Sequence, residues 1–287
     1  MRTPPAILGK IAESTLARVA KAKEILPLEK LLKNLKPQRS QSFTEEEKTF
    51  EAKTPCSSVY SVVKNILPFE SALAAPGLSF ICEVKKASPS KGIIAEHFPW
   101  LEIAKEYEEG GAAAISVLTE PEFFLGSDQY LREISAAVAI PALRKDFIID
   151  PYQIYEAKLL GASAVLLICA LLEPQTLSEY MKLAKELSLD CLVEIHSEEE
   201  AKEAVGEGAK IIGINNRDLT TFKVDTELTS RLVKKIPAEI LIVAESGINN
   251  ADDIRALKEI GADAVLIGES LMRAANRKQL LSDWKLA

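Results

Sequence analysis

The amino-acid sequence predicts a closed (β/α)8 barrel that carries an N-terminal helical extension. Two observations lead to this fold class. A polar, periodic segment repeatedly ends in Gly-Ala and is followed by a short β-rich run. Eight strand candidates can be counted along about 210 residues, each separated from the next by room for one helix. This spacing suits a closed barrel better than an open doubly wound sheet, which is the structural alternative.

The Gly-Ala junctions mark places where a helix ends and a strand begins. They read EEGGAAAISVLT (108–119), LLGASAVLLI (159–168), GEGAKIIGIN (206–215) and EIGADAVLIG (259–268). Glycine suits the position just after a helix because it adopts the left-handed conformation without Cβ strain. Each junction therefore predicts one strand.

The remaining strand candidates are apolar runs between these junctions. They are LSFICEV (78–84), PALRKD (141–146), LDCLVEI (189–195) and EILIVAES (239–246). The predicted strands end near residues 84, 118, 145, 168, 194, 215, 245 and 268. Helical periodicity fills the intervals: PQTLSEYMKLAKELS (174–188), for example, puts its apolar residues on one face.

We divide the chain into an N-terminal extension, residues 1–66, and a barrel domain, residues 67–287. Two amphipathic helices are predicted in the extension, and their apolar faces need the barrel as a surface. The predicted apolar positions are Leu8, Ile11, Ala12, Leu16, Val19, Leu28, Leu31, Leu32 and Leu35. Residues 36–66 are polar without a clean period, so we interpret them as a mobile connection with room for one short helix.

The composition excludes several classes of function. The 287 residues are 47% hydrophobic and 27% charged, with a formal net charge of −7, which removes the usual electrostatic basis for nucleic-acid binding. The N-terminus lacks the apolar core of a signal peptide, and the longest apolar run, residues 159–172, is too short to span a bilayer. We therefore expect a cytoplasmic protein with a small substrate, bound neither to membranes nor to nucleic acid.

Cysteine and histidine usage argues against a structural metal. Cys56, Cys82, Cys169 and Cys191 are widely spaced without a C-x-x-C motif, which is typical of core cysteines in a reducing compartment. The chain has only two histidines, and they form no H-E-x-x-H motif.

Charged and amide side chains gather at the predicted strand ends. In a barrel of this kind the carboxyl ends of the strands form the mouth of the active site. The residues at these ends are Glu83, Lys85, Lys145, Glu194, Asn215, Arg217, Glu245 and Ser246. Such a set could transfer protons, with lysines made acidic by neighbouring lysines and partial burial and with Glu194 as base. A structural ion-pair network is the alternative.

Two further patterns suggest a site for an anion and a site for a ring. Gly247 and Gly268 follow the seventh and eighth strands, where barrels of this type bind phosphate. Ser88 and Ser90, after Lys85, could donate hydrogen bonds to the same anion or simply form the turn that Pro89 favours. Phe124, Phe147 and Phe222 lie near strand ends and could form an apolar wall, although core packing is the default for each.

The sequence resembles a known family. EVKKASPSKG, SVLTEPEFFLGS, LRKDFIIDPYQIYEAKLLGASAVLLI, LVEIH, IGINNRDLTTF, VAESGI and LIGESLM occur in the order seen in indole-3-glycerol phosphate synthases, the (β/α)8 enzymes of tryptophan biosynthesis. The resemblance covers residues 68–275 and extends to residues 7–31, which are similar to that family's extra helix. Residues 36–66 match less well.

The resemblance implies a reaction without a cofactor or a metal. The substrate would be 1-(o-carboxyphenylamino)-1-deoxyribulose 5-phosphate, which is cyclised, decarboxylated and dehydrated. Lys145 would be the general acid, Glu194 the carboxylate that stabilises a cationic intermediate or acts as base, and Lys85 a substrate-binding group that assists dehydration with Glu83 beside it.

The remaining site residues are also implied by resemblance. Asn215 and Glu245 would orient the ribulose hydroxyls, with Arg217 and Ser246 in support. The phosphate positions correspond to Ser88, Gly247, Gly268 and Glu269. Some relatives have serine in place of Glu269, and a carboxylate there would repel phosphate unless only its backbone N–H points inward. The apolar ring pocket corresponds to Phe124, Phe147, Leu166 and Phe222, with Pro89 at its edge.

Other functions stay open at this point. A lysine at a barrel strand end also suits a Schiff-base aldolase. An isomerase of a neighbouring intermediate and a non-catalytic phosphate-ester sensor are further alternatives. The sequence leaves the oligomeric state open, with a monomer as one expectation, and it does not exclude other tryptophan-pathway enzymes as partners.

Overall fold

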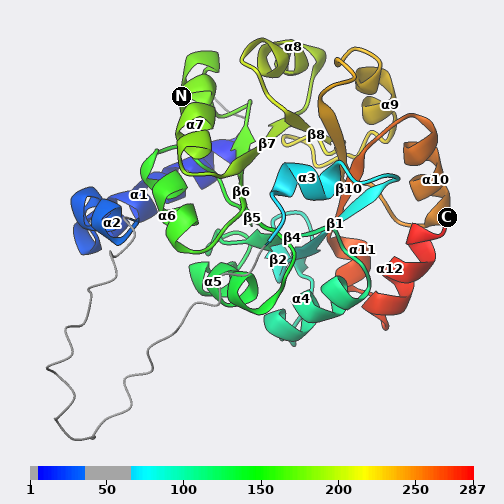
Figure 1. Cartoon of the computed structure of the whole chain (residues 1–287), viewed down its shortest axis with the longest axis horizontal. Coiled ribbons are helices and arrows are strands. Elements are labelled where there is room, and N and C mark those ends of the chain that lie inside the picture. The colour runs from blue at the N-terminus through cyan, green and yellow to red at the C-terminus, as the bar shows by residue number, and fades with distance from the viewer. Residues whose placement is uncertain (1–5, 36–65) are drawn as a thin grey trace, which may run out of the picture.

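The barrel is closed by parallel pairing all the way round (Figure 1). The computed structural model describes residues 6–35 and 66–287. Its barrel strands are β1 (Ser79–Val84), β4 (Ala114–Leu118), β5 (Ala142–Lys145), β6 (Ala164–Ile168), β7 (Asp190–Ile195), β8 (Ile211–Asn215), β9 (Leu241–Glu245) and β10 (Ala264–Ile267). Closure follows because β1 pairs with both β4 and β10. The predicted fold class is confirmed, and every strand ends within one residue of its predicted position.

Helices surround the strands on the outside of the barrel (Figure 1). They are α4 (Trp100–Glu109), α5 (Asp128–Ala137), α6 (Tyr152–Leu159), α7 (Pro174–Glu186), α8 (Glu198–Gly206), α9 (Glu227–Val233), α10 (Ala251–Glu259) and α12 (Arg277–Lys285), with the one-turn helix α11 (Glu269–Met272) directly after β10. The glycines of the four junctions, Gly111, Gly161, Gly208 and Gly261, all have φ between 86° and 88°. The predicted left-handed helix ends are therefore confirmed.

Three short elements, one before β1 and two after it, were not predicted from the sequence. Helix α3 (Phe69–Leu73) lies against the start of the barrel: Ser79, the first residue of β1, donates from Oγ to the Leu73 carbonyl, and the backbone N–H of Glu70 donates to Asp190 at the start of β7. The Ser-Pro-Ser segment is the tip of a hairpin formed by β2 (Ala87–Ser88) and β3 (Gly92–Ile93). Elements this short show no sequence period.

The N-terminal helices α1 (Ala6–Ile25) and α2 (Leu28–Leu35) pack on the barrel as the predicted stripes require, with two exceptions. Leu16 is 46% exposed, because the buried stripe continues through Thr15 to Val19 and Leu16 lies about 100° further round the helix. Leu28 is 39% exposed, whereas Leu31 is fully buried. The prediction was wrong for these two residues because several apolar stripes fit the same segment.

Helix α1 is fixed to the mouth side of the barrel by both apolar and polar contacts. Val19 and Leu31 form a small cluster with Tyr152 of α6, whose hydroxyl donates to the Leu26 carbonyl over 2.9 Å. Arg18 pairs with the buried Asp146, directly after β5, over 2.7 Å. The connection predicted over residues 36–66 falls, apart from its last residue, outside the described residues.

The cysteines and the length of the helices can be compared with the expectations from composition. Cys82 and Cys169 are buried, as predicted for core cysteines, and Cys191 is half-buried; the described cysteines form no disulfide, and Cys56 lies outside the described part. None of the described helices is long and apolar enough to cross a membrane.

Replacing Leu31 by Ala should destabilise the docking of the extension. Leu31 is fully buried between Val19 and Tyr152, so we expect the free energy of unfolding to fall by about 2–4 kcal/mol. Leu28→Ala, on the exposed face of the same helix, is the matched control and should cost less than about 1 kcal/mol. Urea unfolding followed by circular dichroism measures both. Equal losses would contradict this packing.

Candidate active site

A cavity of about 590 Å³ opens at the carboxyl ends of the strands. It is lined by every residue that the sequence analysis assigned to the site: Glu83, Lys85, Ser88, Pro89, Phe124, Lys145, Phe147, Leu166, Glu194, Asn215, Arg217, Phe222, Glu245, Ser246, Gly247, Gly268 and Glu269. They come together because all strands of a parallel barrel end at the same rim. Their individual roles stay predictions.

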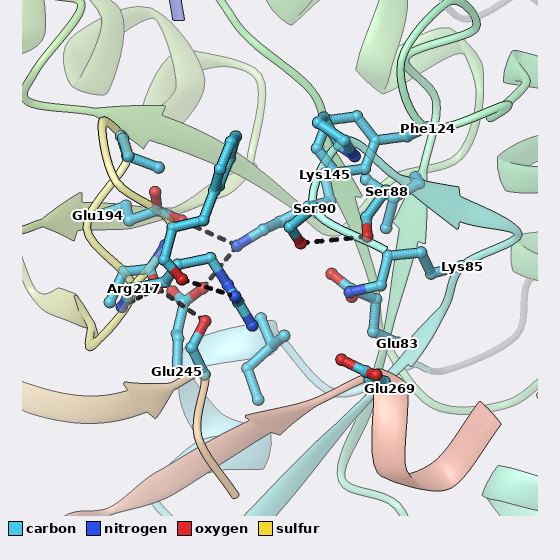
Figure 2. Close-up of a pocket in the computed structure, with 18 of the residues that line it drawn as sticks. Glu83, Lys85, Ser88, Ser90, Phe124, Lys145, Glu194, Arg217, Glu245 and Glu269 are labelled. Carbon is cyan, nitrogen blue, oxygen red and sulfur yellow. Dashed lines mark hydrogen bonds and ion pairs between the residues drawn. The ribbon is translucent and has the colours of Figure 1, made fainter. Parts of the chain in front are cut away.

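Lys145 occupies the centre of the cavity between two carboxylates (Figure 2). Its Nζ lies 2.9 Å from Oε2 of Glu194 and 2.6 Å from Oε2 of Glu245. These side chains come from the ends of β5, β7 and β9, and all three are largely withdrawn from solvent, Lys145 being 12% exposed. Charged groups are tolerated in a buried position only when they are paired in this way.

A glycine on the strand between β7 and β9 makes room for this cluster. Gly213 of β8 lies in register with Glu194 and with Val243 of β9. A Cβ at Gly213 would overlap Oε1 of Glu245. The absence of a side chain at this position therefore lets Glu245 turn inward to Lys145.

The pKa of Lys145 is raised, which contradicts the expectation of a lysine made acidic by its surroundings. Burial opposes the charged ammonium, but the nearby charges of Glu194, Glu245 and Glu83 outweigh it. The expectation was wrong because it assumed crowding by other lysines. The cations are instead separated, since Lys85 forms its own ion pair with Glu83.

The two carboxylates around Lys145 differ in their pKa values. Burial raises the pKa of Glu245 to about 7, because the ammonium of Lys145 compensates only part of this cost and the charge of Glu194 adds to it. For Glu194 the cost of burial is outweighed by Lys145 and His196, which lower its pKa. Two carboxylates share one ammonium here, so the pair holds one proton more readily than two isolated carboxyls would.

Glu83 and Lys85 form a second charged pair on the opposite side of the cavity (Figure 2). Glu83 is in β1 and is buried, and Lys85 follows the strand. A Cβ at Gly268, at the end of the neighbouring β10, would overlap Oε2 of Glu83 and lie 2.9 Å from Nζ of Lys85. Gly268 thus leaves space for this pair, as Gly213 does for Glu245.

One rim of the cavity gathers small and hydroxyl-bearing residues. Ser88 and Ser90 of the hairpin face each other with 3.5 Å between their Oγ atoms. Ser246 and Gly247 after β9 both have positive φ, 65° and 84°, which turns the backbone sharply. The Glu269 carboxylate lies 3.4 Å from the Lys91 ammonium and 3.2 Å from Nε of Arg273.

Another part of the lining is apolar. The rings of Phe124 and Phe147 lie 5.8 Å apart at 37°, and Leu166 of β6 lies in the same lining. Helix α1 adds Ile7, Leu8 and Ile11, which the sequence analysis did not assign to the site. The predicted apolar stripe includes Leu8 and Ile11 and so predicted their burial, but nothing in the sequence says which surface a helix covers.

Asn215 and Arg217 hold the loop after β8. Oδ1 of Asn215 accepts from Oγ of Ser246 over 2.8 Å and from the backbone N–H of Arg217 over 3.1 Å. The Arg217 guanidinium donates to the carbonyl of Phe222, which has a left-handed φ of 58°. Among the described residues, no group of three or more His, Cys, Asp or Glu side chains is arranged to hold a metal ion.

Replacing Glu245 by Gln should change how stability depends on pH. The pKa of Glu245 in the folded protein, about 7, lies above its ordinary value of 4.5. The folded protein therefore binds more protons than the unfolded chain between these values, and stability is lost as pH rises through this window. Glutamine does not titrate, so the variant should gain on the order of 1–3 kcal/mol relative to wild type between about pH 5 and pH 8.

Denaturant unfolding at a series of pH values measures this difference. Glu239→Gln, an exposed residue just before β9, is the control and should show no such trend. A constant difference between the Glu245 variant and wild type across the range would contradict a raised pKa.

Comparison with solved structures supports the fold alone. The chain is similar to 3-hexulose-6-phosphate synthase from Salmonella typhimurium, with a TM-score of 0.59 and 14% identity over 73% of this chain and 97% of that one. It is also similar to thiamine phosphate pyrophosphorylase from Pyrococcus furiosus, with a TM-score of 0.54 and 19% identity over 76% of this chain and 96% of that one. Both likenesses concern the barrel.

Sequence comparison is more specific. The family model for indole-3-glycerol phosphate synthase matches residues 32–283. The chain is 54% identical to the indole-3-glycerol phosphate synthase of Ruminiclostridium cellulolyticum, over 94% of this chain and 95% of the relative. It is 48% identical to that of Lachnoclostridium phytofermentans, over 97% and 98%. The chain therefore belongs to the indole-3-glycerol phosphate synthase family.

Proposed function

We propose that the protein converts 1-(o-carboxyphenylamino)-1-deoxyribulose 5-phosphate into indole-3-glycerol phosphate, CO2 and water. Family membership supports the reaction, and one observation carries its chemistry. A buried ammonium, Lys145, lies between two carboxylates in a cavity that has an apolar side and a rim of small and hydroxyl-bearing residues. The substrate has the same division, with an aromatic ring at one end and a phosphate at the other.

Binding orients the substrate for ring closure. The aromatic ring lies against Phe124, Phe147 and Leu166, and the phosphate lies at the rim formed by Ser88, Gly247 and Gly268. Holding both ends brings the ring carbon close to the C2′ carbonyl and removes much of the entropy cost of closing a flexible chain. Because Glu269 is already paired with Lys91 and Arg273, its backbone N–H can serve the phosphate without the carboxylate facing it.

Lys145 is the general acid of the first step. As the ring carbon attacks C2′, negative charge develops on the carbonyl oxygen, and the Lys145 ammonium donates a proton to it. A raised pKa is compatible with this role because an alkoxide is more basic than an amine, and it ensures that the proton is present at the start. Glu245 and Asn215 orient the ribulose hydroxyls beside it, with Arg217 and Ser246 in support.

The later steps use the remaining charged groups. Ring attack creates a cationic intermediate, which the ionised Glu194 stabilises until CO2 leaves. Loss of water then needs a proton at the departing hydroxyl and a base for the proton left behind. Lys85, held by Glu83, assists the departure, and Glu194 serves as the base.

The charge state of Lys145 argues against a Schiff-base aldolase. A lysine that attacks a carbonyl must be a neutral amine, whereas the carboxylates of Glu194 and Glu245 favour the ammonium. Borohydride trapping with a ketose phosphate should therefore give no stable adduct. An adduct on Lys145 or Lys85 would favour the aldolase.

We also propose that the enzyme works as a cytoplasmic monomer on this small phosphate ester. A biosynthetic role and the unpaired thiols of Cys82 and Cys191 support a reducing compartment. The net charge of −7 disfavours nucleic acid as a partner.

A turnover assay tests the proposed reaction. The EDTA-treated protein is mixed with 1-(o-carboxyphenylamino)-1-deoxyribulose 5-phosphate, and indole fluorescence is followed. A rising signal supports the synthase and its independence of metal. A flat signal, with binding of the phosphate ester shown separately by calorimetry, would favour a sensor.

Lys145→Ala should abolish turnover while leaving binding nearly intact. Loss of a general acid costs about 10²–10⁴-fold, and loss of the ammonium that holds both carboxylates adds to this. Affinity for the product should change by less than about tenfold, because the ring and phosphate contacts stay. Lys105→Ala, on the exposed face of α4, is the control and should keep wild-type rates. A variant that retains most of its rate would rule out Lys145 as the acid.

Gly268→Ala should impair the second charged pair without straining the backbone. The φ of Gly268 is −119°, which alanine adopts readily, but the new Cβ would overlap Glu83 and crowd Lys85. We expect kcat/KM to fall by about 10–100-fold through displacement of these groups. Gly206→Ala, in α8 with nothing within 4 Å of its Cβ position, is the matched control. Equal activity of the two variants would contradict a role for this close approach.

A further inference from the structure

His196 lies directly behind Glu194 and has no part in the reaction described above. It follows the last residue of β7, and its side chain is 14% exposed. It does not line the active-site cavity. Its ring instead lines a second cavity of about 460 Å³, together with Glu200, Asn216 and Asp218. Its ion-pair contact with a residue of the proposed reaction is with Glu194.

The ring bridges two carboxylates. Nε2 lies 3.4 Å from Oε1 of Glu194, and Nδ1 lies 3.5 Å from Oε2 of Glu200. Both nitrogens are shielded from solvent, and neither forms a hydrogen bond within the described part of the chain. Two buried ring nitrogens that each face a carboxylate oxygen need only a small adjustment to donate to both.

Glu200 is fixed independently of the histidine ring. It lies in the first turn of α8, and its backbone N–H donates to Oγ of Ser197, the residue that caps this helix, over 3.2 Å. Its Oε2 accepts from the backbone N–H of His196 over 2.6 Å. Glu200 is therefore an anchored carboxylate, and the ring between it and Glu194 has little freedom to turn.

The surroundings of the ring favour its charged form. Burial alone would lower the pKa of His196, but the nearby carboxylates of Glu200, Glu194 and Glu245 raise it. The charged groups that face or adjoin the ring are Glu194 of β7, Glu200 of α8, Glu245 of β9, and Arg217 and Asp218 after β8. Glu194 and Glu245 share a single positive charge, that of Lys145. A protonated His196 ring would supply a second positive charge beside them.

We propose that His196 is a positioning residue for the reaction: anchored by Glu200, its ring fixes the orientation of Glu194 from outside the cavity. The inference depends on the function proposed above. One oxygen of Glu194, Oε2, is held by Lys145 and the other, Oε1, by the ring. Because both of its oxygens are held, the Glu194 carboxylate keeps one face toward the substrate. Without the ring, the carboxylate would be held by Lys145 alone and would rotate when Lys145 gives up its proton.

Kinetics of two His196 variants separate positioning from packing. Glutamine can place its amide nitrogen near the position of Nε2, whereas asparagine is too short to reach Glu194. We expect His196→Asn to lower kcat by about 10–100-fold with KM changed less than about threefold, because Glu194 acts after binding. His196→Gln should recover a large part of the lost rate. Glu199→Gln, an exposed neighbour on α8, is the control and should keep wild-type rates.

A titration by NMR tests the contacts without any turnover. The chain has only His97 and His196, so a His97→Gln variant assigns both ring signals. We expect His196 to titrate above its ordinary pKa of 6.5 and to shift toward lower pH in both Glu194→Gln and Glu200→Gln. The His97 signal is the internal control and should not move in either variant.

The two measurements distinguish failure of this inference from failure of the proposed function. Wild-type protein without turnover would contradict the function, while the titration still reports the ring between Glu194 and Glu200. An active wild type whose His196→Asn variant keeps its kcat would overturn the positioning role. A His196 titration unaffected by Glu194→Gln would overturn it as well.

Discussion

The arrangement on which the site depends is the burial of Lys145 between Glu194 and Glu245. Its three side chains come from β5, β7 and β9, so it exists only when the barrel is closed and its strands are in register. Gly213, on the strand between the two carboxylates, leaves the space that Glu245 occupies. The barrel thereby brings Lys145 and Glu245, which are 100 positions apart in the sequence, into a contact of 2.6 Å between Nζ and Oε2.

This cluster is costly for stability, which explains its place in the fold. Charged groups taken out of water recover their solvation only through good pairing, and an apolar replacement of similar volume is often as stable. Here two carboxylates share one ammonium, and the pKa of Glu245 rises to about 7 as a result. The apolar strands around the cluster supply the stability that the cluster lacks. This is the arrangement expected when charged groups are held in place for a reaction and not to stabilise the fold.

The sequence predicted the strand ends and the site residues for a common reason. Gly-Ala junctions mark helix ends locally, and a parallel barrel brings all strand ends to one rim, so residues such as Lys145 and Glu194 could be grouped without coordinates. Side-chain contacts and pKa shifts that depend on neighbours in three dimensions could not be predicted from the sequence. The sequence did not indicate that Leu8 and Ile11 of the extension reach the cavity, that Thr15 rather than Leu16 is buried, or that the pKa of Lys145 is raised.

A crystal structure of the protein with an unreactive analogue, in which the C2′ ketone of the substrate is reduced to an alcohol, tests the central claim most directly. We expect the C2′ oxygen within about 3.2 Å of Nζ of Lys145, with the phosphate at the rim of Ser88, Gly247 and Gly268 and the ring against Phe124 and Phe147. A complex in which that oxygen faces Lys85 instead, or in which the phosphate lies away from this rim, would contradict the account.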